Sequence, residues 1–236
     1  MHENGPAPST SADARTAPST GADADPAFPA PLVDQPVDVD VTDRTTVYEG
    51  AVWDVVQETF HLPEAGGALT RDVLAHTGAV AVAAIDEDDR ILLIRQYRHP
   101  IRMRDWEIPA GLRDVAGEEP AVTAARELGE EADLQATDWH TLADMYTTPG
   151  GSTEVIRIYL ARGVTDLPHA QRTQREGEER GIVLRWTPLA EAVDAVLAGR
   201  IGNATACLAI LHADRARARG WTGLRPVDAP WPGGSD

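Results

Sequence analysis

The chain has 236 residues and a formal net charge of −17, from 21 Lys and Arg against 38 Asp and Glu. This balance argues against a nucleic-acid partner and against an anionic membrane surface, because both require clustered cations. No apolar run approaches the roughly 20 residues of a membrane-spanning helix. The N-terminus has no signal-peptide pattern and Cys207 is the single cysteine. We therefore expect a soluble cytoplasmic protein without disulfides.

Composition divides the chain into four segments. Residues 1–37 are rich in Ala and Pro with few core-forming side chains, which predicts a disordered tail. Residues 38–77 contain β-prone runs separated by a turn, which predicts a small antiparallel sheet. Residues 78–220 alternate strands with helices and form the main domain. Residues 221–236 are expected to be a loose C-terminal tail.

The main domain carries strand patterns on both sides of a helix. Strands are predicted at 79–85, 91–97, 140–146, 154–161 and 182–186. Helices are predicted at 119–132, 188–198 and 204–218. Pro120 suits the first turn of the first helix, where a missing N–H has no cost. This order of elements predicts an α/β sandwich.

The first of these helices carries a cluster of carboxylates. Glu127, Glu130 and Glu131 are spaced i, i+3 and i+4, so they share one helix face. Such close anions repel one another unless a cation lies between them, and oxygen ligands suit Mg²⁺ or Mn²⁺. Glu118 precedes the helix and can turn toward the same site, with Arg126 as a counter-charge. The competing interpretation is a solvated acidic face.

The whole segment resembles the Nudix box, in which a glycine and a glutamate precede an Arg-Glu-apolar-any-Glu-Glu run. Here Gly111 and Glu118 precede residues 126–131. Two features depart from the pattern. One extra residue separates Gly111 from Glu118, and Asp133 replaces a late glycine. Asp tolerates the left-handed conformation of a helix end better than most residues.

Flanking motifs narrow the resemblance to the ADP-ribose pyrophosphatases of that family. They are the segments 95–98 (RQYR), 106–111 (WEIPAG), 148–154 (TPGGSTE) and 199–204 (GRIGNA). The resemblance implies a Nudix α/β/α sandwich with a mixed sheet, preceded by the small N-terminal antiparallel sheet. It also implies a homodimer that exchanges this sheet, and two to three Mg²⁺ or Mn²⁺ ions per site.

The resemblance implies roles for individual residues. Glu127 and Glu131 are the expected direct metal ligands, assisted by Glu130, Glu118 and the backbone carbonyl of Ala110. The general base is expected in the acidic loop 175–181. Glu178 is favoured, with Glu179 as base or extra ligand and Glu176 third; the alternative is a merely solvated loop.

Substrate contacts are expected from several elements. Arg98 suits a diphosphate or ribose because guanidinium matches phosphate oxygens, although an exposed ion pair is the alternative. Trp53 can stack on adenine and Arg71 can reach over from the same sheet, unless both only pack. The remaining candidates, by resemblance, are Glu107, Leu112, Gly151 and Glu154. The histidines, His76 among them, are interpreted as structural or surface residues.

The leading functional hypothesis is Mg²⁺-dependent hydrolysis of ADP-ribose to AMP and ribose 5-phosphate. The same chemistry on a sugar nucleotide or a dinucleotide is the alternative, because fold and box do not choose the substrate. A nucleotide-binding Nudix module without turnover is the non-enzymatic alternative. A nucleoside triphosphatase fits less well, since such chains usually lack the N-terminal sheet.

Overall fold

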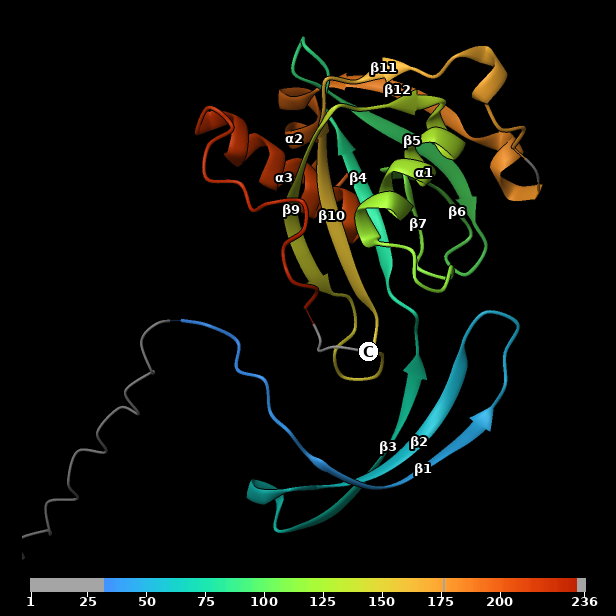
Figure 1. The fold of residues 1–236 in the computed structure, drawn as a ribbon, viewed down its shortest axis with the longest axis vertical. Helices are drawn as coiled ribbons and strands as arrows, with labels where there is room; N and C mark the ends of the chain where they lie inside the picture. Colours follow the sequence, from blue (N-terminus) through green and yellow to red (C-terminus); the bar gives the residue numbers. More distant parts are fainter. Residues whose placement is uncertain (1–31, 176, 233–236) are drawn as a thin grey trace, which may run out of the picture. The chain divides into compact units, whose positions relative to one another are not determined.

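A computed structural model describes residues 32–175 and 177–232 (Figure 1). The chain divides into two units, residues 1–37 and residues 38–236. The described part of the first unit, residues 32–37, contains no helix or strand. Residues 1–31 of the predicted disordered tail therefore lie outside the described residues. All further elements belong to the second unit.

The second unit begins with the small antiparallel sheet that the sequence predicts. Its strands are β1 (Asp40–Tyr48), β2 (Asp54–Leu62) and β3 (Gly67–Ala75), in the order β1-β2-β3. A short 3₁₀ turn, Pro63–Ala65, joins the last two strands, and Gly66 follows it in the left-handed conformation. All nine residues of β1 are exposed.

A mixed four-stranded sheet forms the centre of the main domain. Its strands are β4 (Ala79–Ala84), β7 (Ala110–Leu112), β9 (Asp138–Tyr146) and β10 (Val155–Arg162), in the order β7-β4-β10-β9. Strands β4 and β10 are parallel, and the outer pairings are antiparallel. Every residue of β4 is buried. This near-continuous apolar run is typical of a strand covered on both faces.

A second, antiparallel sheet has the order β12-β5-β6. Its strands are β5 (Arg90–Arg98), β6 (Met103–Glu107) and β12 (Val183–Pro188). The sequence pattern predicts β5 and β12 but neither β6 nor β7. Strand β6 ends and β7 begins in the segment 106–111, whose Pro109 interrupts any strand pattern. The two-residue strands β8 (Leu134–Gln135) and β11 (Thr165–Asp166) form a separate pair.

Helices cover both faces of the sheets, as the predicted sandwich requires (Figure 1). Helix α1 (Pro120–Ala132) packs with the side chains of Val80, Val82 and Leu92. Helices α2 (Leu189–Leu197) and α3 (Ala204–Ala218) pack with the residues of the same strands that point to the opposite face. The α3 side chains in this core are mostly alanines: Ala206, Ala209, Ala213 and Ala216. Short 3₁₀ helices span His169–Gln171 and Gly177–Gly181.

The described part of the C-terminal segment differs from the loose tail expected from residue 221. The buried Arg157 guanidinium donates to the carbonyls of Ala229 and Pro230, at 2.5 and 2.6 Å. Trp231 lies against the guanidinium groups of Arg113 and Arg157, at 4.2 and 5.2 Å from its ring centroid. Arginine–aromatic contacts and a buried donor that needs acceptors fix this segment despite its Pro-rich composition. The composition could not reveal the buried arginine that binds it.

Within the described residues, no helix is long and apolar enough to cross a membrane.

Candidate active site

The carboxylates of α1 surround one guanidinium. Arg126 Nη1 lies 2.7 Å from Glu127 Oε1 and 3.0 Å from Glu130 Oε2. Its Nη2 lies 3.2 Å from Glu118 Oε2. The counter-charge expected from the sequence therefore contacts three of the four glutamates at once. This ion-pair network relieves the repulsion between carboxylates on one helix face.

Two of the glutamates pack against the backbone of strand β7. Glu131 is only 4% exposed, and its Oε2 accepts a hydrogen bond from the Ala110 amide at 2.9 Å. A Cβ atom at Gly111 would collide with the Glu127 carboxylate. Gly111 is thus needed for close approach of the strand and the helix. The fold brings Ala110, Glu127 and Glu131 together, and their roles as metal ligands stay predictions.

Electrostatics in this cluster favour the charged forms. The hydrogen bond from Arg126 holds the pKa of the Glu118 carboxyl below its ordinary value. Burial opposes the charge of Arg126, but its bond to Glu118 and the charges of Glu127 and Glu130 raise its pKa above the ordinary value. The contact between Arg126 and Glu118 therefore favours the charged form of both side chains.

Both departures from the Nudix pattern are accommodated locally. The extra residue before Glu118 lies in a turn in which the Glu118 amide bonds to the Val115 carbonyl and Gly117 has φ +78°. Glu118 still reaches Arg126. At the other end of α1, Asp133 adopts the left-handed conformation with φ 58° and ψ 32°, as a helix-ending glycine would.

Asp133 also connects the helix to the acidic loop. Arg175 Nη2 lies 2.6 Å from Asp133 Oδ2, and Arg175 Nε donates to the Glu130 carbonyl at 3.1 Å. The start of the loop is therefore fixed at the end of the glutamate-bearing helix. Glu176 lies outside the described residues, and of Glu178 and Glu179 only the backbone is described. Their expected roles as general base stay predictions.

Arg98 and Glu107 form a bidentate ion pair on strands β5 and β6. Arg98 Nε and Nη2 each lie 2.7 Å from an oxygen of Glu107. Glu107 is 4% exposed and also accepts from Gln96 at 3.3 Å. The Arg98 side chain is half-exposed. The ion pair anticipated as an alternative for Arg98 is present, and a substrate contact by Arg98 stays a prediction.

A third group centres on His76, for which the sequence predicts a structural or surface role. Its ring stacks on Trp53 with centroids 5.6 Å apart, and its Nε2 lies 3.3 Å from Glu154 Oε1. Its Nδ1 accepts from the Gly78 amide, which leaves Nε2 as the donor. Trp53 and Glu154, which are both predicted site residues, thus both contact His76. No spacing signal in the sequence could identify His76, because its partners are distant in the chain.

The remaining candidates lie on backbone elements. The Gly151 carbonyl accepts from the Leu74 amide at 2.9 Å, which attaches the loop 148–154 to strand β3. Leu112 ends β7, opposite Ala79. Arg71 is exposed on β3 and donates to the carbonyl of its neighbour Thr70. Substrate contacts by Gly151, Leu112 and Arg71 stay predictions.

The glutamates on and before α1, together with the backbone of Ala110, fit a divalent cation by their chemistry. They supply only oxygen donors, including the Ala110 carbonyl that follows Pro109 at the start of β7. Over residues 32–175 and 177–232, no three acidic, histidine or cysteine side chains are already gathered as a metal cluster. Arg126 instead forms ion pairs with Glu127 and Glu130.

Comparison with known proteins identifies relatives over most of the chain. The NUDIX domain family model matches residues 75–206. An ADP-ribose pyrophosphatase of Mycobacterium tuberculosis is 42% identical over 194 residues, which are 82% of this chain and 91% of that protein. An ADP-ribose pyrophosphatase of Bacillus subtilis is 32% identical, over 72% of this chain and 89% of that protein. A crystal structure of an ADP compounds hydrolase has the same fold, with a TM-score of 0.64 at 20% identity over 80% of this chain and 99% of that chain.

Proposed function

Because this chain belongs to the Nudix family, we propose that it hydrolyses the diphosphate bond of ADP-ribose and releases AMP and ribose 5-phosphate. When one phosphorus–oxygen bond of the diphosphate breaks, water supplies the hydroxyl group that one product gains and the proton that the other gains. The names of two relatives, at 42% and 32% identity, support this substrate.

The observation that carries the proposal is the packing of the α1 glutamates against strand β7. Glu131 accepts from the Ala110 amide, and Glu127 fills the space that a side chain at Gly111 would take. This contact holds the carboxylates beside a backbone carbonyl on rigid elements. A merely solvated acidic face would not require it.

Nudix ADP-ribose pyrophosphatases generally depend on divalent metal, and we assign the cation here to Glu127, Glu130, Glu131, Glu118 and the Ala110 carbonyl. We expect two to three Mg²⁺ or Mn²⁺ ions. When bound, such ions neutralise the diphosphate and lower the pKa of a bound water. Arg126 orients Glu118 and Glu130, and its own charge lies close to the same carboxylates.

The general base is assigned to the loop 175–181, with Glu178 first, Glu179 second and Glu176 third. The attachment of Arg175 to Asp133 and to the Glu130 carbonyl supports this assignment, because it holds the start of the loop next to the glutamate-bearing helix. A base near the metal ligands is within reach of a water aligned for in-line attack.

Recognition of the substrate is assigned to two groups. Arg98, held by Glu107 and half-exposed, offers its guanidinium to a phosphate or a ribose hydroxyl. Trp53, 44% exposed, offers a ring face for adenine. Glu154, Gly151, Leu112 and Arg71 complete the proposed site.

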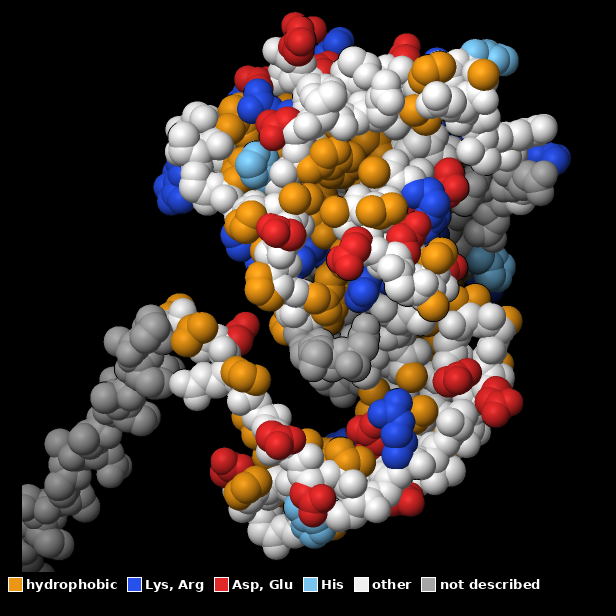
Figure 2. Space-filling view, in the orientation of Figure 1, with side chains coloured by type: hydrophobic (Ala, Val, Ile, Leu, Met, Phe, Trp, Pro, Cys, Tyr) orange, Lys and Arg blue, Asp and Glu red, His pale blue; other side chains and the backbone are white. Residues whose placement is uncertain are grey.

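We further propose a cytoplasmic homodimer. Exposed apolar side chains on and beside the N-terminal sheet support the dimer: Val41, Val47, Tyr48, Val52 and Trp53. Figure 2 shows hydrophobic side chains among the charged ones on this sheet. A partner subunit that covers them would remove them from water, and sedimentation at several protein concentrations measures the association.

The proposed function is tested by measuring the release of AMP from ADP-ribose in the presence of Mg²⁺. Chromatography detects the AMP. ADP-glucose, NADH and a nucleoside triphosphate are assayed in parallel, each with and without EDTA. Preference for ADP-ribose, abolished by EDTA, is the expected result. Preference for another compound of the panel would refute the substrate and leave the metal chemistry standing. No turnover of any of them by folded protein would favour the binding module.

A further inference from the structure

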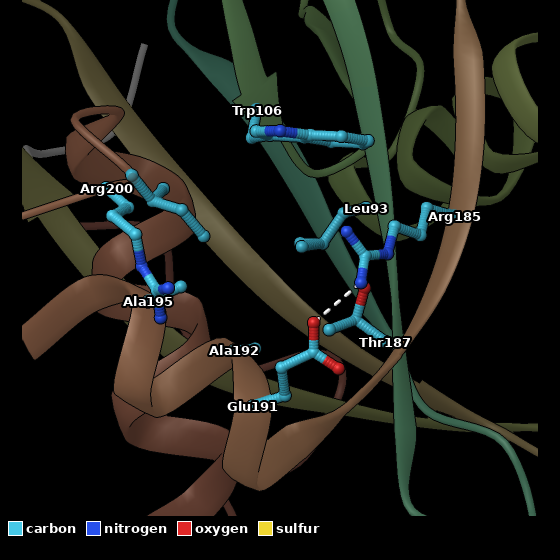
Figure 3. Close-up of a pocket in the computed structure, with 9 residues that line it drawn as sticks. Leu93, Trp106, Arg185, Thr187, Glu191, Ala192, Ala195 and Arg200 are labelled. Carbon is cyan, nitrogen blue, oxygen red and sulfur yellow. Dashed lines mark hydrogen bonds and ion pairs between the residues drawn. The ribbon is translucent and has the colours of Figure 1, made fainter. Parts of the chain in front are cut away.

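A cavity of about 220 Å³ lies on the face of the β12-β5-β6 sheet opposite Glu107 (Figure 3). Successive side chains of a strand point to opposite faces. Glu107 therefore points with Gln96 and Arg98, whereas its neighbour Trp106 points toward α2 and lines the cavity. The cavity is thus separated by the sheet from the proposed reaction centre.

The walls of the cavity suit one flat ring. Trp106 spans one side, with Leu93 beside it and Ala192 across the space (Figure 3). Ala195 and Ile201 complete the apolar lining. A volume near 220 Å³ is below the roughly 300–1,000 Å³ of drug-sized sites, so it admits a single substituted ring.

The charges at the cavity favour an anion. Arg185 and Arg200 approach from opposite sides (Figure 3). Arg185 is paired with Glu191 at 2.6 Å, whereas Arg200 makes no side-chain hydrogen bond or ion pair with any described residue. One guanidinium is therefore unmatched, in a chain whose net charge is −17. A carboxylate is the natural partner of such a group.

A second polar group also lacks a partner. The hydroxyl of Thr187, a residue only 4% exposed, lines the cavity and has no hydrogen bond among the described residues. Buried polar groups without partners are rare because they lose hydration without compensation. Thr187 and Arg200 lie on different sides of the cavity, beneath the Trp106 ring (Figure 3).

We propose that this cavity binds a small hydroxyaromatic carboxylate. The ring stacks on Trp106, the carboxylate accepts from Arg200, and the ligand hydroxyl pairs with Thr187. This binding is separate from hydrolysis and needs no metal.

Binding is tested with 4-hydroxybenzoate on the full chain labelled with 5-fluorotryptophan. The chain has six Trp, and Trp106→Phe assigns the resonance of the cavity. We expect a saturable shift of that resonance with a Kd of about 1 mM, as befits so small a ligand. Benzoate, which lacks the hydroxyl, should bind about 5-fold more weakly, and uncharged 4-hydroxybenzamide about 10-fold more weakly.

Two variants test the assignment of each polar group. Thr187→Val should abolish the preference for 4-hydroxybenzoate over benzoate. Arg200→Gln should abolish the preference for 4-hydroxybenzoate over 4-hydroxybenzamide. Arg215→Gln, an exposed arginine of α3 outside the cavity, should change neither ratio. Absence of a Trp106 shift at about 20 mM ligand overturns the proposal, given expected affinities near 1 mM. Ratios that the two cavity variants leave unchanged overturn it as well.

Discussion

His76 Nε2 lies 3.3 Å from Glu154 Oε1, and this pair joins the end of strand β3 to the loop that precedes β10. The His76 side chain is 3% exposed and stacks on Trp53. Glu154 also accepts a hydrogen bond from the Thr147 hydroxyl. The orientation of the proposed adenine-stacking ring is thus linked to a carboxylate about a hundred residues further along the chain.

Replacement of His76 by Ala should raise the KM for ADP-ribose about 10-fold, because Trp53 and Glu154 lose their common support. The same replacement should change kcat by less than about 3-fold, because the α1 glutamates remain. Steady-state kinetics measure both constants. His61→Ala, an exposed histidine on β2, is the control. A fall in kcat with unchanged KM would contradict a role in positioning Trp53.

Glu131→Gln should lower kcat by about 100-fold or more and leave the fold intact, because the amide keeps the shape and the acceptor for the Ala110 amide but loses the charge. AMP release and the circular dichroism spectrum are the two measurements. Glu119→Gln removes an exposed carboxylate just before α1 and should be nearly silent. Full activity in Glu131→Gln, or its failure to fold, would refute the metal-ligand assignment.

Arg126→Gln removes the cation that three glutamates share. In EDTA the variant should be destabilised by about 1–2 kcal/mol, since the remaining carboxylates repel one another. For a chain of this size that corresponds to a fall in Tm of about 2–8 °C. Mg²⁺ should raise the Tm of the variant more than that of the wild type. An equal rise in both proteins would show that Arg126 and the metal do not share these carboxylates.

Trp231→Ala should lower the free energy of unfolding by about 2 kcal/mol, because the ring contacts two arginines and covers the left-handed Gly78. Urea denaturation measures the loss. Asp228→Ala, an exposed position in the same segment, provides the comparison. Equal stability of the two variants would mean that the C-terminal segment contributes little.

Cys207 should react slowly with iodoacetamide at pH 8. Burial raises the pKa of its thiol, and the nearby charge of Asp105 adds to the effect. A raised pKa leaves less thiolate at a given pH, and only the thiolate is the nucleophile. We expect alkylation about 10-fold slower than that of a free cysteine, accelerating as the pH rises. Mass spectrometry of timed samples follows the modification; a rate equal to that of the free amino acid would contradict the burial.

Periodicity and local chemistry in the sequence predicted helix α1, the mixed α/β architecture and the N-terminal sheet. The i, i+3, i+4 spacing placed the glutamates on one face with Arg126 as a counter-charge, and the structure shows Arg126 in contact with three of them. Strands β6 and β7 were missed because each is short and Pro109 lies between them. The contacts of His76 and Arg157 depend on partners many residues away, which a single sequence does not encode as a local pattern.

The alanines of helix α3 and strand β4 have a practical consequence for protein engineering. Ala206, Ala209 and Ala213 are fully buried beside a strand whose residues are only Ala and Val. Small side chains permit the helix and the sheet to approach closely, and they leave no room for larger ones. Substitution of any of these alanines by Leu should cost about 1–3 kcal/mol through overpacking. Thermostable variants are therefore better sought on exposed positions such as Leu197 and Val122, where a polar helix-forming residue replaces an exposed apolar one.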